Sequence, residues 1–186
     1  METQTPIDAH GVTVKLQVTY CLGFQYRVAD VQGKFVSMTT KFAKRVTKEL
    51  RSLAKDPLTG IKVEYGVDLQ HYTAILEGVE DTAFEGGVFV LSIVLGDAYP
   101  QEPPLIIFQT KCFHPNIYRD GKICLDILQK NWVSSYTLGS VLQSIQQLLS
   151  DPNPDSPANT EASSLFVDDK REYLRRVREC VEASWI

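Results

Sequence analysis

Four short segments rich in β-branched and aromatic residues follow one another between positions 61 and 109, and helical patterns occur only before and after them. The segments span residues 61–69, 71–77, 87–95 and 105–109. The links between them are short and rich in Gly, Pro and Asp, which suits an antiparallel meander. Because strands and helices are segregated along the chain, this order predicts an α+β fold with helices on one face of an antiparallel sheet.

The helices are predicted from apolar residues at helical spacing. A first helix is expected at residues 39–55, where the apolar stripe is Phe42, Val46, Leu50 and Leu53. A central helix is expected at 138–149, with Thr137 as its N-cap. Two further helices are expected, at 161–167 and 170–185. The long irregular stretch at 110–136 separates the strands from these last helices, and such an ordered loop is usually functional.

The polar face of the first helix is basic in a chain that is acidic as a whole. The net charge is −4 and the isoelectric point is about 5.4. On this face a single acid, Glu49, stands against six cations, which are Lys41, Lys44, Arg45, Lys48, Arg51 and Lys55. The pattern is typical of a solvated helix face and equally of a surface that docks an acidic partner.

Residues 1–38 form a predicted N-terminal extension to a core domain at 39–186. The alternation of Val12, Val14, Leu16 and Val18 with polar residues favours a strand or a hairpin that turns near Gly23. No motif in the extension carries recognisable chemistry.

Composition narrows the classes of function. With 186 residues and 44% hydrophobic side chains, the chain can bury a core without disulfides. The absence of an overall basic character argues against nucleic-acid binding, and no apolar run is long enough for a membrane span. The N-terminus lacks the pattern of a secretory signal. The four cysteines are therefore expected to be free thiols in the cytoplasm or the nucleus.

Within the irregular stretch, Cys124 has two interpretations. A nucleophilic cysteine needs a thiolate and access to substrate, whereas a structural cysteine packs as a small hydrophobe. His114 lies ten residues earlier and serves either as its base or as a loop-ordering residue. Asn116 either donates to an oxyanion or stabilises the turn after Pro115. A zinc site from Cys112, His114 and Cys124 lacks paired-ligand spacing and an obvious fourth ligand.

These residues belong to a string that resembles the active-site block of ubiquitin-conjugating enzymes. The string is FHPNIY at 113–118, GKICLDIL at 121–128, and then Trp132. Other motifs of that family occur in the same order along the chain: FEGGVF at 84–89, YP at 99–100, PP at 103–104 and DPNP at 151–154. The resemblance spans residues 39–185.

The resemblance implies a fold, an activity and roles for single residues. The fold would be that of the UBC domain, with Cys124 receiving ubiquitin as a thioester from an activating enzyme and passing it to a substrate lysine. Asn116 would support aminolysis through an oxyanion or by holding the loop, which His114 and Pro115 would organise. Ser156 stands where many relatives have an Asp that orients the lysine. No cofactor is implied, because the activating enzyme consumes the ATP.

The resemblance also implies two partner surfaces. The activating enzyme would meet the basic face of the first helix, and a RING-type ligase would meet the same helix end with two nearby loops. The residues implied are Lys41, Lys44, Arg45, Lys48, Gln101, Glu102, Ser134 and Ser135. The segments SPAN at 156–159, KREY at 170–173 and VEASW at 181–185 are similar to the branch that ubiquitylates histones and sliding clamps in DNA-damage tolerance.

Two alternatives to a ubiquitin carrier remain at the level of sequence. One is a carrier of another modifier such as SUMO, and the other is a non-catalytic ubiquitin-binding variant. The presence of Cys124 and Asn116 argues against the second, and the CLDIL string at 124–128 is more similar to ubiquitin carriers.

Overall fold

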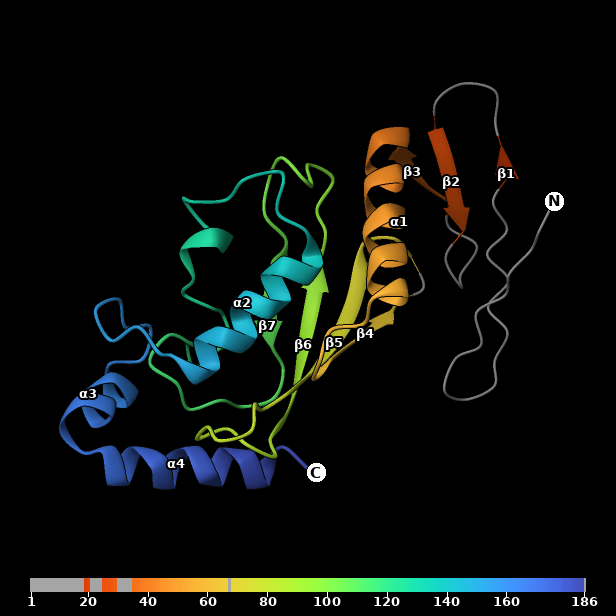
Figure 1. Ribbon diagram of the computed structural model, residues 1–186. Coiled ribbons are helices and arrows are strands. Elements are labelled where there is room, and N and C mark those ends of the chain that lie inside the picture. Colours follow the sequence, from red (N-terminus) through yellow and green to blue (C-terminus); the bar gives the residue numbers. More distant parts are fainter. Residues whose placement is uncertain (1–18, 21–24, 30–34, 67, 186) are drawn as a thin grey trace.

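The computed structural model describes residues 19–20, 25–29, 35–66 and 68–185. An α-helix precedes a four-stranded sheet, and the remaining helices follow it, so the predicted α+β fold is confirmed (Figure 1). The elements of this core are α1 (Thr40–Lys55), β4 (Ile61–Tyr65), β5 (His71–Glu77), β6 (Val88–Val94), β7 (Leu105–Phe108), the 3₁₀-helix η1 (Asp126–Leu128), α2 (Leu138–Ser150), α3 (Thr160–Asp168) and α4 (Lys170–Ala183).

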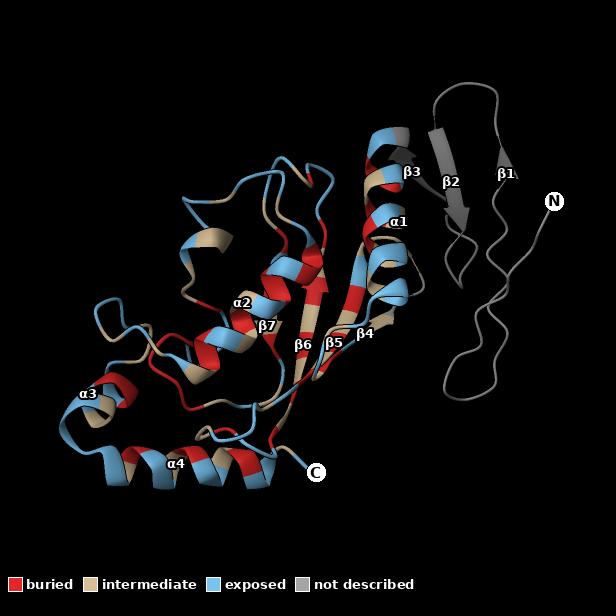
Figure 2. Cartoon of the chain, viewed as in Figure 1, coloured by how far each residue is buried: buried red, intermediate tan, exposed pale blue. Residues whose placement is uncertain are grey.

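The sheet is the expected antiparallel meander in the order β4-β5-β6-β7. Ala74 on β5 pairs with Leu91 on β6, which pairs in turn with Phe108 on β7. All three side chains are buried, because residues paired across neighbouring strands point to the same face of the sheet. That face packs into one core with the apolar side of the helices, as the buried positions in Figure 2 show.

Helix α2 supplies the largest helical share of this core, and it begins where the sequence predicts. Thr137 and Ser140 form a reciprocal capping box, in which each side chain bonds the backbone N–H of the other. The apolar side of the helix is buried, and its members are Leu138, Val141, Leu142, Ile145, Leu148 and Leu149. Among the described residues, no helix has the length and apolar character needed to cross a bilayer.

Helices α3 and α4 lie at the end of the sheet where β5 turns into β6 (Figure 1). The side chain of Asn159 caps α3 by accepting from the N–H of Ala162. The end of α4 is tied to the β5–β6 turn, because Ser184 Oγ accepts from Val88 N and the indole of Trp185 donates to the carbonyl of Gly86. Both helices were predicted.

A second sheet precedes the core. Its strands β1 (Thr19–Tyr20), β2 (Gln25–Ala29) and β3 (Phe35–Thr39) are antiparallel in that order, and they lie beside α1 in Figure 1. This agrees with the strand character expected for the extension. The predicted turn at Gly23 lies outside the described residues, as does the alternating segment at 12–18.

A buried carboxylate joins α1 to α2. Glu49 is 6% exposed and accepts from Tyr99 Oη at 2.9 Å and from the backbone N–H of Leu138, the first residue of α2, at 2.7 Å. Arg45, one turn earlier on α1, forms an ion pair with the same carboxylate. Anions are favoured at a helix N-terminus, so Glu49 offsets the partial positive charge at the start of α2 as well as the charge of the Arg45 guanidinium. Burial, followed by the Glu49 charge, raises the pKa of Tyr99, which keeps the phenol a donor.

We predict that Glu49→Ala lowers the free energy of unfolding by about 3 kcal/mol, because it leaves the buried Tyr99 hydroxyl and the N–H of Leu138 without their acceptor and removes the ion partner of Arg45. Urea denaturation measures this loss. Tyr99→Phe removes one hydroxyl and is expected to cost about 1 kcal/mol. The exposed neighbour Lys48 provides the control, and Lys48→Ala should change stability by less than about 0.5 kcal/mol. Equal stability of Glu49→Ala and Lys48→Ala would contradict the structural role of the carboxylate.

Candidate active site

Cys124 and Asn116 face each other across a small hairpin in the irregular stretch. The hairpin is held by the bridge between Ile117 and Ile123 and by the bond from Tyr118 N to the carbonyl of Lys122, 2.9 Å. Next along the hairpin, the N–H of Cys124 donates to the carbonyl of Asn116 at 2.8 Å. The motif residues are therefore brought together by backbone pairing.

Gly121 fixes this hairpin to the edge of the sheet. Its carbonyl accepts from Phe108 N at 2.9 Å, and Lys122 bridges to Ile107 on β7. Gly121 has a φ of +84°, and a Cβ at this position would lie 2.1 Å from the carbonyl oxygen of Phe108. Only glycine fits both the left-handed conformation and the close backbone approach.

The side chain of Asn116 ties the hairpin to the segment that follows α2. It is fully buried, and its Nδ2 donates to the carbonyls of Asn153, 2.7 Å, and Ser156, 3.1 Å. Its Oδ1 accepts from Asn153 N at 2.8 Å. Both amide hydrogens are thus used inside the protein, which favours the loop-holding role over oxyanion donation in this state.

Pro115 adds a second tie between the same two segments. Its carbonyl accepts from the N–H groups of Ala158, 2.8 Å, and Asn159, 2.9 Å. The start of α3 therefore sits next to the hairpin. The carbonyl of Ser156 accepts from the Asn116 side chain, and Ser156 is an exposed residue.

His114 is a structural residue. Its Nε2–H donates to the carbonyl of Leu148 at 2.9 Å, while Nδ1 accepts from Asn116 N at 2.9 Å. Burial lowers the pKa of His114 to about 4. Both ring nitrogens are occupied and the imidazole is neutral at physiological pH, so His114 does not act as a base toward Cys124. These two bonds favour the loop-ordering interpretation of this histidine.

Cys124 is a partly exposed free thiol between the buried Ile123 and the partly buried Leu125. Cys112 and Cys180 are also free thiols, and burial raises the pKa of both. In the part of the chain that the structure describes, no three His, Cys, Asp or Glu side chains gather as metal ligands would.

All but one of the predicted partner residues are exposed, and the exception is Arg45. Lys41, Lys44 and Lys48 are exposed along α1. Arg45 instead turns inward, where its guanidinium donates to the carbonyls of Ser134, 2.8 Å, and Tyr136, 2.6 Å, besides pairing with Glu49. Arg45 therefore connects α1 to the loop before α2.

The two loops of the predicted ligase surface are also connected. The indole of Trp132 donates to the carbonyl of Pro100 at 2.9 Å, and its ring packs against Tyr99 and Tyr136. This aromatic group holds the loop at 132–136 beside the loop at 99–102. The exposed residues of the two loops include Gln101, Glu102, Ser134 and Ser135.

Comparison with known proteins identifies this arrangement. A family model described as ubiquitin-conjugating enzyme matches residues 45–181. The chain belongs to the ubiquitin-conjugating enzyme family. It is 49% identical over 150 residues to ubiquitin-conjugating enzyme E2 3 of Arabidopsis thaliana, an alignment that covers 80% of this chain and all of the relative. Ubiquitin-conjugating enzyme E2 2 of Mycosarcoma maydis is 45% identical, and ubiquitin-conjugating enzyme E2 1 of Caenorhabditis elegans is 43% identical.

These two alignments also cover 80% of this chain, with 81% and 78% of the respective relatives. The chain is thus a transferase of the ubiquitin pathway, and ubiquitin, an activating enzyme and a ligase are its general partners. Sequence reasoning about this ubiquitin-conjugating enzyme missed Asn153, which bonds the Asn116 amide on both sides. The DPNP motif marked its position without indicating this contact.

We predict that the neutral state of His114 makes the enzyme acid-sensitive. Its pKa is about 4 when folded and 6.5 when unperturbed, so below 6.5 the unfolded chain binds a proton that the folded chain does not. The stability contribution is complete above 6.5 and is lost as the pH falls toward 4, by about 3 kcal/mol in full. Urea unfolding of the wild type and of His114→Gln between pH 7 and 4.5 measures it. The variant should show the smaller pH dependence, and parallel curves would contradict the prediction.

We predict that Asn116→Ala lowers the free energy of unfolding by about 2 kcal/mol, because it leaves Asn153 N–H and two carbonyls without their partner. Asn116→Asp should be at least as damaging, since a carboxylate accepts but does not donate to those carbonyls. Urea denaturation measures both variants, with Asn131→Ala at an exposed position as the matched control. Wild-type stability of Asn116→Ala together with slow transfer would instead assign the amide to the oxyanion.

Proposed function

We propose that Cys124 is the residue that carries ubiquitin as a thioester, and that a substrate lysine then takes the ubiquitin from it. One observation supports this assignment above the others. Cys124 is a partly exposed thiol whose backbone is paired with Asn116, in a hairpin bonded to both the sheet edge and the start of α3. A thioester on this sulfur would be attached to a fixed frame and reachable from solvent.

The proposed reaction has two steps. In the first, the Cys124 sulfur attacks the carbonyl of the thioester that joins ubiquitin's C-terminus to the activating enzyme, and that enzyme's cysteine leaves as a thiolate. In the second, the neutral amine of a lysine attacks the carbonyl on Cys124, an amide bond forms as the C–S bond breaks, and the proton lost from the nitrogen passes to the departing thiolate or to solvent. A lysine that enters a less polar groove loses its proton more readily, so His114 is not needed as a base.

We expect Cys124→Ala to abolish thioester formation. The protein is mixed with ubiquitin, a ubiquitin-activating enzyme and ATP, and the products are separated on a non-reducing gel. The wild type should give a band heavier by one ubiquitin that a thiol reductant removes. Cys180→Ala, a change at another free thiol, is the matched control and should retain the band. A band that survives in Cys124→Ala would contradict the assignment.

The same assay separates ubiquitin from other modifiers. The family and its named relatives favour ubiquitin over SUMO, and a partly exposed Cys124 favours a carrier over a non-catalytic binding variant. Charging with SUMO and its own activating enzyme should give no band. Charging with SUMO alone would overturn the proposed cargo.

We propose that Ser156 borders the groove through which the acceptor lysine approaches, and that the exposed loops hold the ligase. Ser156 is exposed, and its carbonyl bonds the Asn116 amide, which places it beside the hairpin of Cys124. The ligase surface would consist of Gln101, Glu102, Ser134 and Ser135, which Trp132 holds close together through its bond to Pro100.

The activating enzyme is proposed to bind the exposed lysines of α1, and charge reversal tests this. Lys44→Glu and Lys48→Glu should each slow thioester formation by about tenfold at low salt, because steering toward an acidic partner depends on these charges. The initial rate of charging at limiting activating enzyme measures the effect. Lys62→Glu, at an exposed position on β4, is the control. Equal rates for all three variants would contradict the surface.

A further inference from the structure

Lys122 lies on the same side of the hairpin as Cys124, two positions before it. The backbone between them is extended, because Lys122 and Ile123 both form bridges to neighbouring segments. Side chains alternate between the two sides of such a segment. Ile123 points inward and is buried, whereas Lys122 is exposed and Cys124 is partly exposed. The amine of Lys122 and the thiol of Cys124 therefore project from the protein on one side.

The side chain of Lys122 is long enough to reach a thioester on Cys124. Two residues of an extended chain span about 6.6 Å. A lysine carries its nitrogen on a flexible four-carbon stem, and the carbonyl carbon of a thioester lies one bond beyond the cysteine sulfur. The nitrogen of Lys122 thus meets that carbon through side-chain rotations alone, without a change in the backbone.

Asp120 holds Lys122 at two points. One carboxylate oxygen accepts from the backbone N–H of Lys122 at 3.1 Å, and the other accepts from its Nζ at 2.9 Å. The side chain is therefore drawn toward Asp120, which precedes it, rather than toward Cys124, which follows it. The bond to Asp120 also raises the pKa of Lys122. The nitrogen is kept as an ammonium, which has no free electron pair for attack on a carbonyl.

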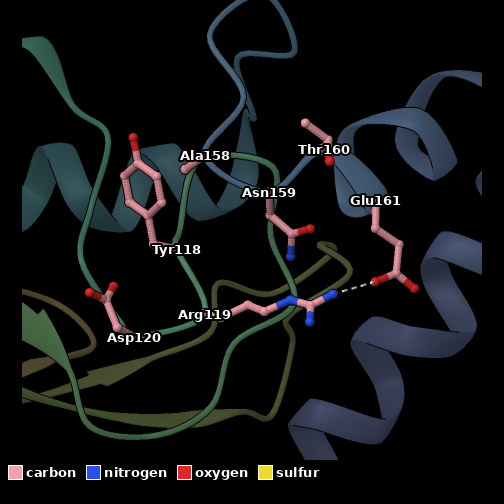
Figure 3. A pocket seen from close by; sticks show the side chains of 7 residues that line it. All are labelled: Tyr118, Arg119, Asp120, Ala158, Asn159, Thr160 and Glu161. Atoms are coloured by element: carbon pink, nitrogen blue, oxygen red, sulfur yellow. Dashed lines mark hydrogen bonds and ion pairs between the residues drawn. The ribbon is translucent and has the colours of Figure 1, made fainter.

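The cation next to Asp120 in the chain has a different partner. Figure 3 shows Arg119 reaching toward Glu161 on α3, while Asp120 points the other way. The nitrogen–oxygen distance between Arg119 and Glu161 is 3.4 Å. The side chains of Asp120 and Lys122 are 55% and 61% exposed. An ion pair this exposed is weak, so Asp120 slows the approach of Lys122 to Cys124 without preventing it.

We propose that Lys122 is a site of self-modification, which takes ubiquitin from Cys124 of the same molecule, and that Asp120 limits the rate of this transfer. The proposal rests on the proposed function of Cys124. Once Nζ of Lys122 has lost one proton to solvent, it attacks the thioester carbonyl. An amide bond forms as the C–S bond breaks, and the second proton lost from the nitrogen passes to the departing thiolate or to solvent. The products are ubiquitin bonded to Lys122 and a free thiol at Cys124.

The test uses the full chain, charged with ubiquitin, then freed of ATP and followed on gels with and without a thiol reductant. Reductant removes the thioester but not the self-modified product. We expect that product to form at a first-order rate constant independent of enzyme concentration, and mass spectrometry should locate ubiquitin on Lys122. Lys122→Arg should remove this product. Lys130→Arg, at an exposed lysine six positions after Cys124, is the matched control and should retain it.

Asp120→Asn tests the restraint. It keeps an oxygen that accepts from the backbone of Lys122 and removes the charge that holds the amine. Self-transfer should become about two- to fivefold faster, the range of an exposed ion pair. Each rate is divided by the rate of transfer to free lysine in solution, so a general change in thioester reactivity cancels. The wild type and Asp120→Asn should converge at about 1 M salt, where charges are screened within about 3 Å.

Glu64→Gln is the control for this charge removal. It breaks another surface ion pair, with Lys62 on β4 at 2.8 Å, and should leave the ratio at the wild-type value. A ratio that Asp120→Asn leaves unchanged would overturn the restraint. Absence of ubiquitin on Lys122 in both the wild type and Asp120→Asn would overturn the self-modification, and so would a rate constant that rises with enzyme concentration. These results would leave the role of Cys124 intact, whereas failure to form a thioester would overturn the proposed function and this inference with it.

Discussion

The buried amide of Asn116 is the interaction on which the candidate active site depends. Its side chain donates to the carbonyl of Asn153 and accepts from the N–H of the same residue, and it also donates to the carbonyl of Ser156. A buried amide is stable only when its polar atoms are all matched, so the two segments must keep their relative positions. The backbone of Cys124, which bonds the Asn116 carbonyl, is held in place by the same contacts.

A second buried polar group fixes the opposite end of the structure. Glu49 binds the N-terminus of α2 and the hydroxyl of Tyr99, while Arg45 extends the network to the loop before α2. The loops of the proposed ligase surface are connected through these same side chains. The segments that hold Cys124 and the loops of the proposed ligase surface are thus connected through α2. Glu49 accepts from the first N–H of this helix, and His114 donates to its Leu148 carbonyl.

The sequence predicted the fold well where the pattern is local, and the site less well where it depends on long-range pairing. The helices and the meander follow from apolar spacing and turn residues, and Thr137 was recognised as a cap from its position alone. The inward turn of Arg45 was not predicted, because its acceptors are backbone carbonyls about 90 positions away that have no residue-type pattern. The neutral state of His114 likewise depends on burial, which the motif does not show.

In the hairpin of Cys124, buried contacts constrain some residues and leave others unconstrained. Gly121 must be glycine because of its backbone conformation and close contact. The polar atoms of Asn116 and His114 are occupied by hydrogen bonds within the protein. Arg119 takes part in none of these contacts, because its side chain is 85% exposed and shares Glu161 with Arg176. In such a site buried contacts fix the position of Cys124, and an exposed position such as Arg119 tolerates change without disturbing the fold.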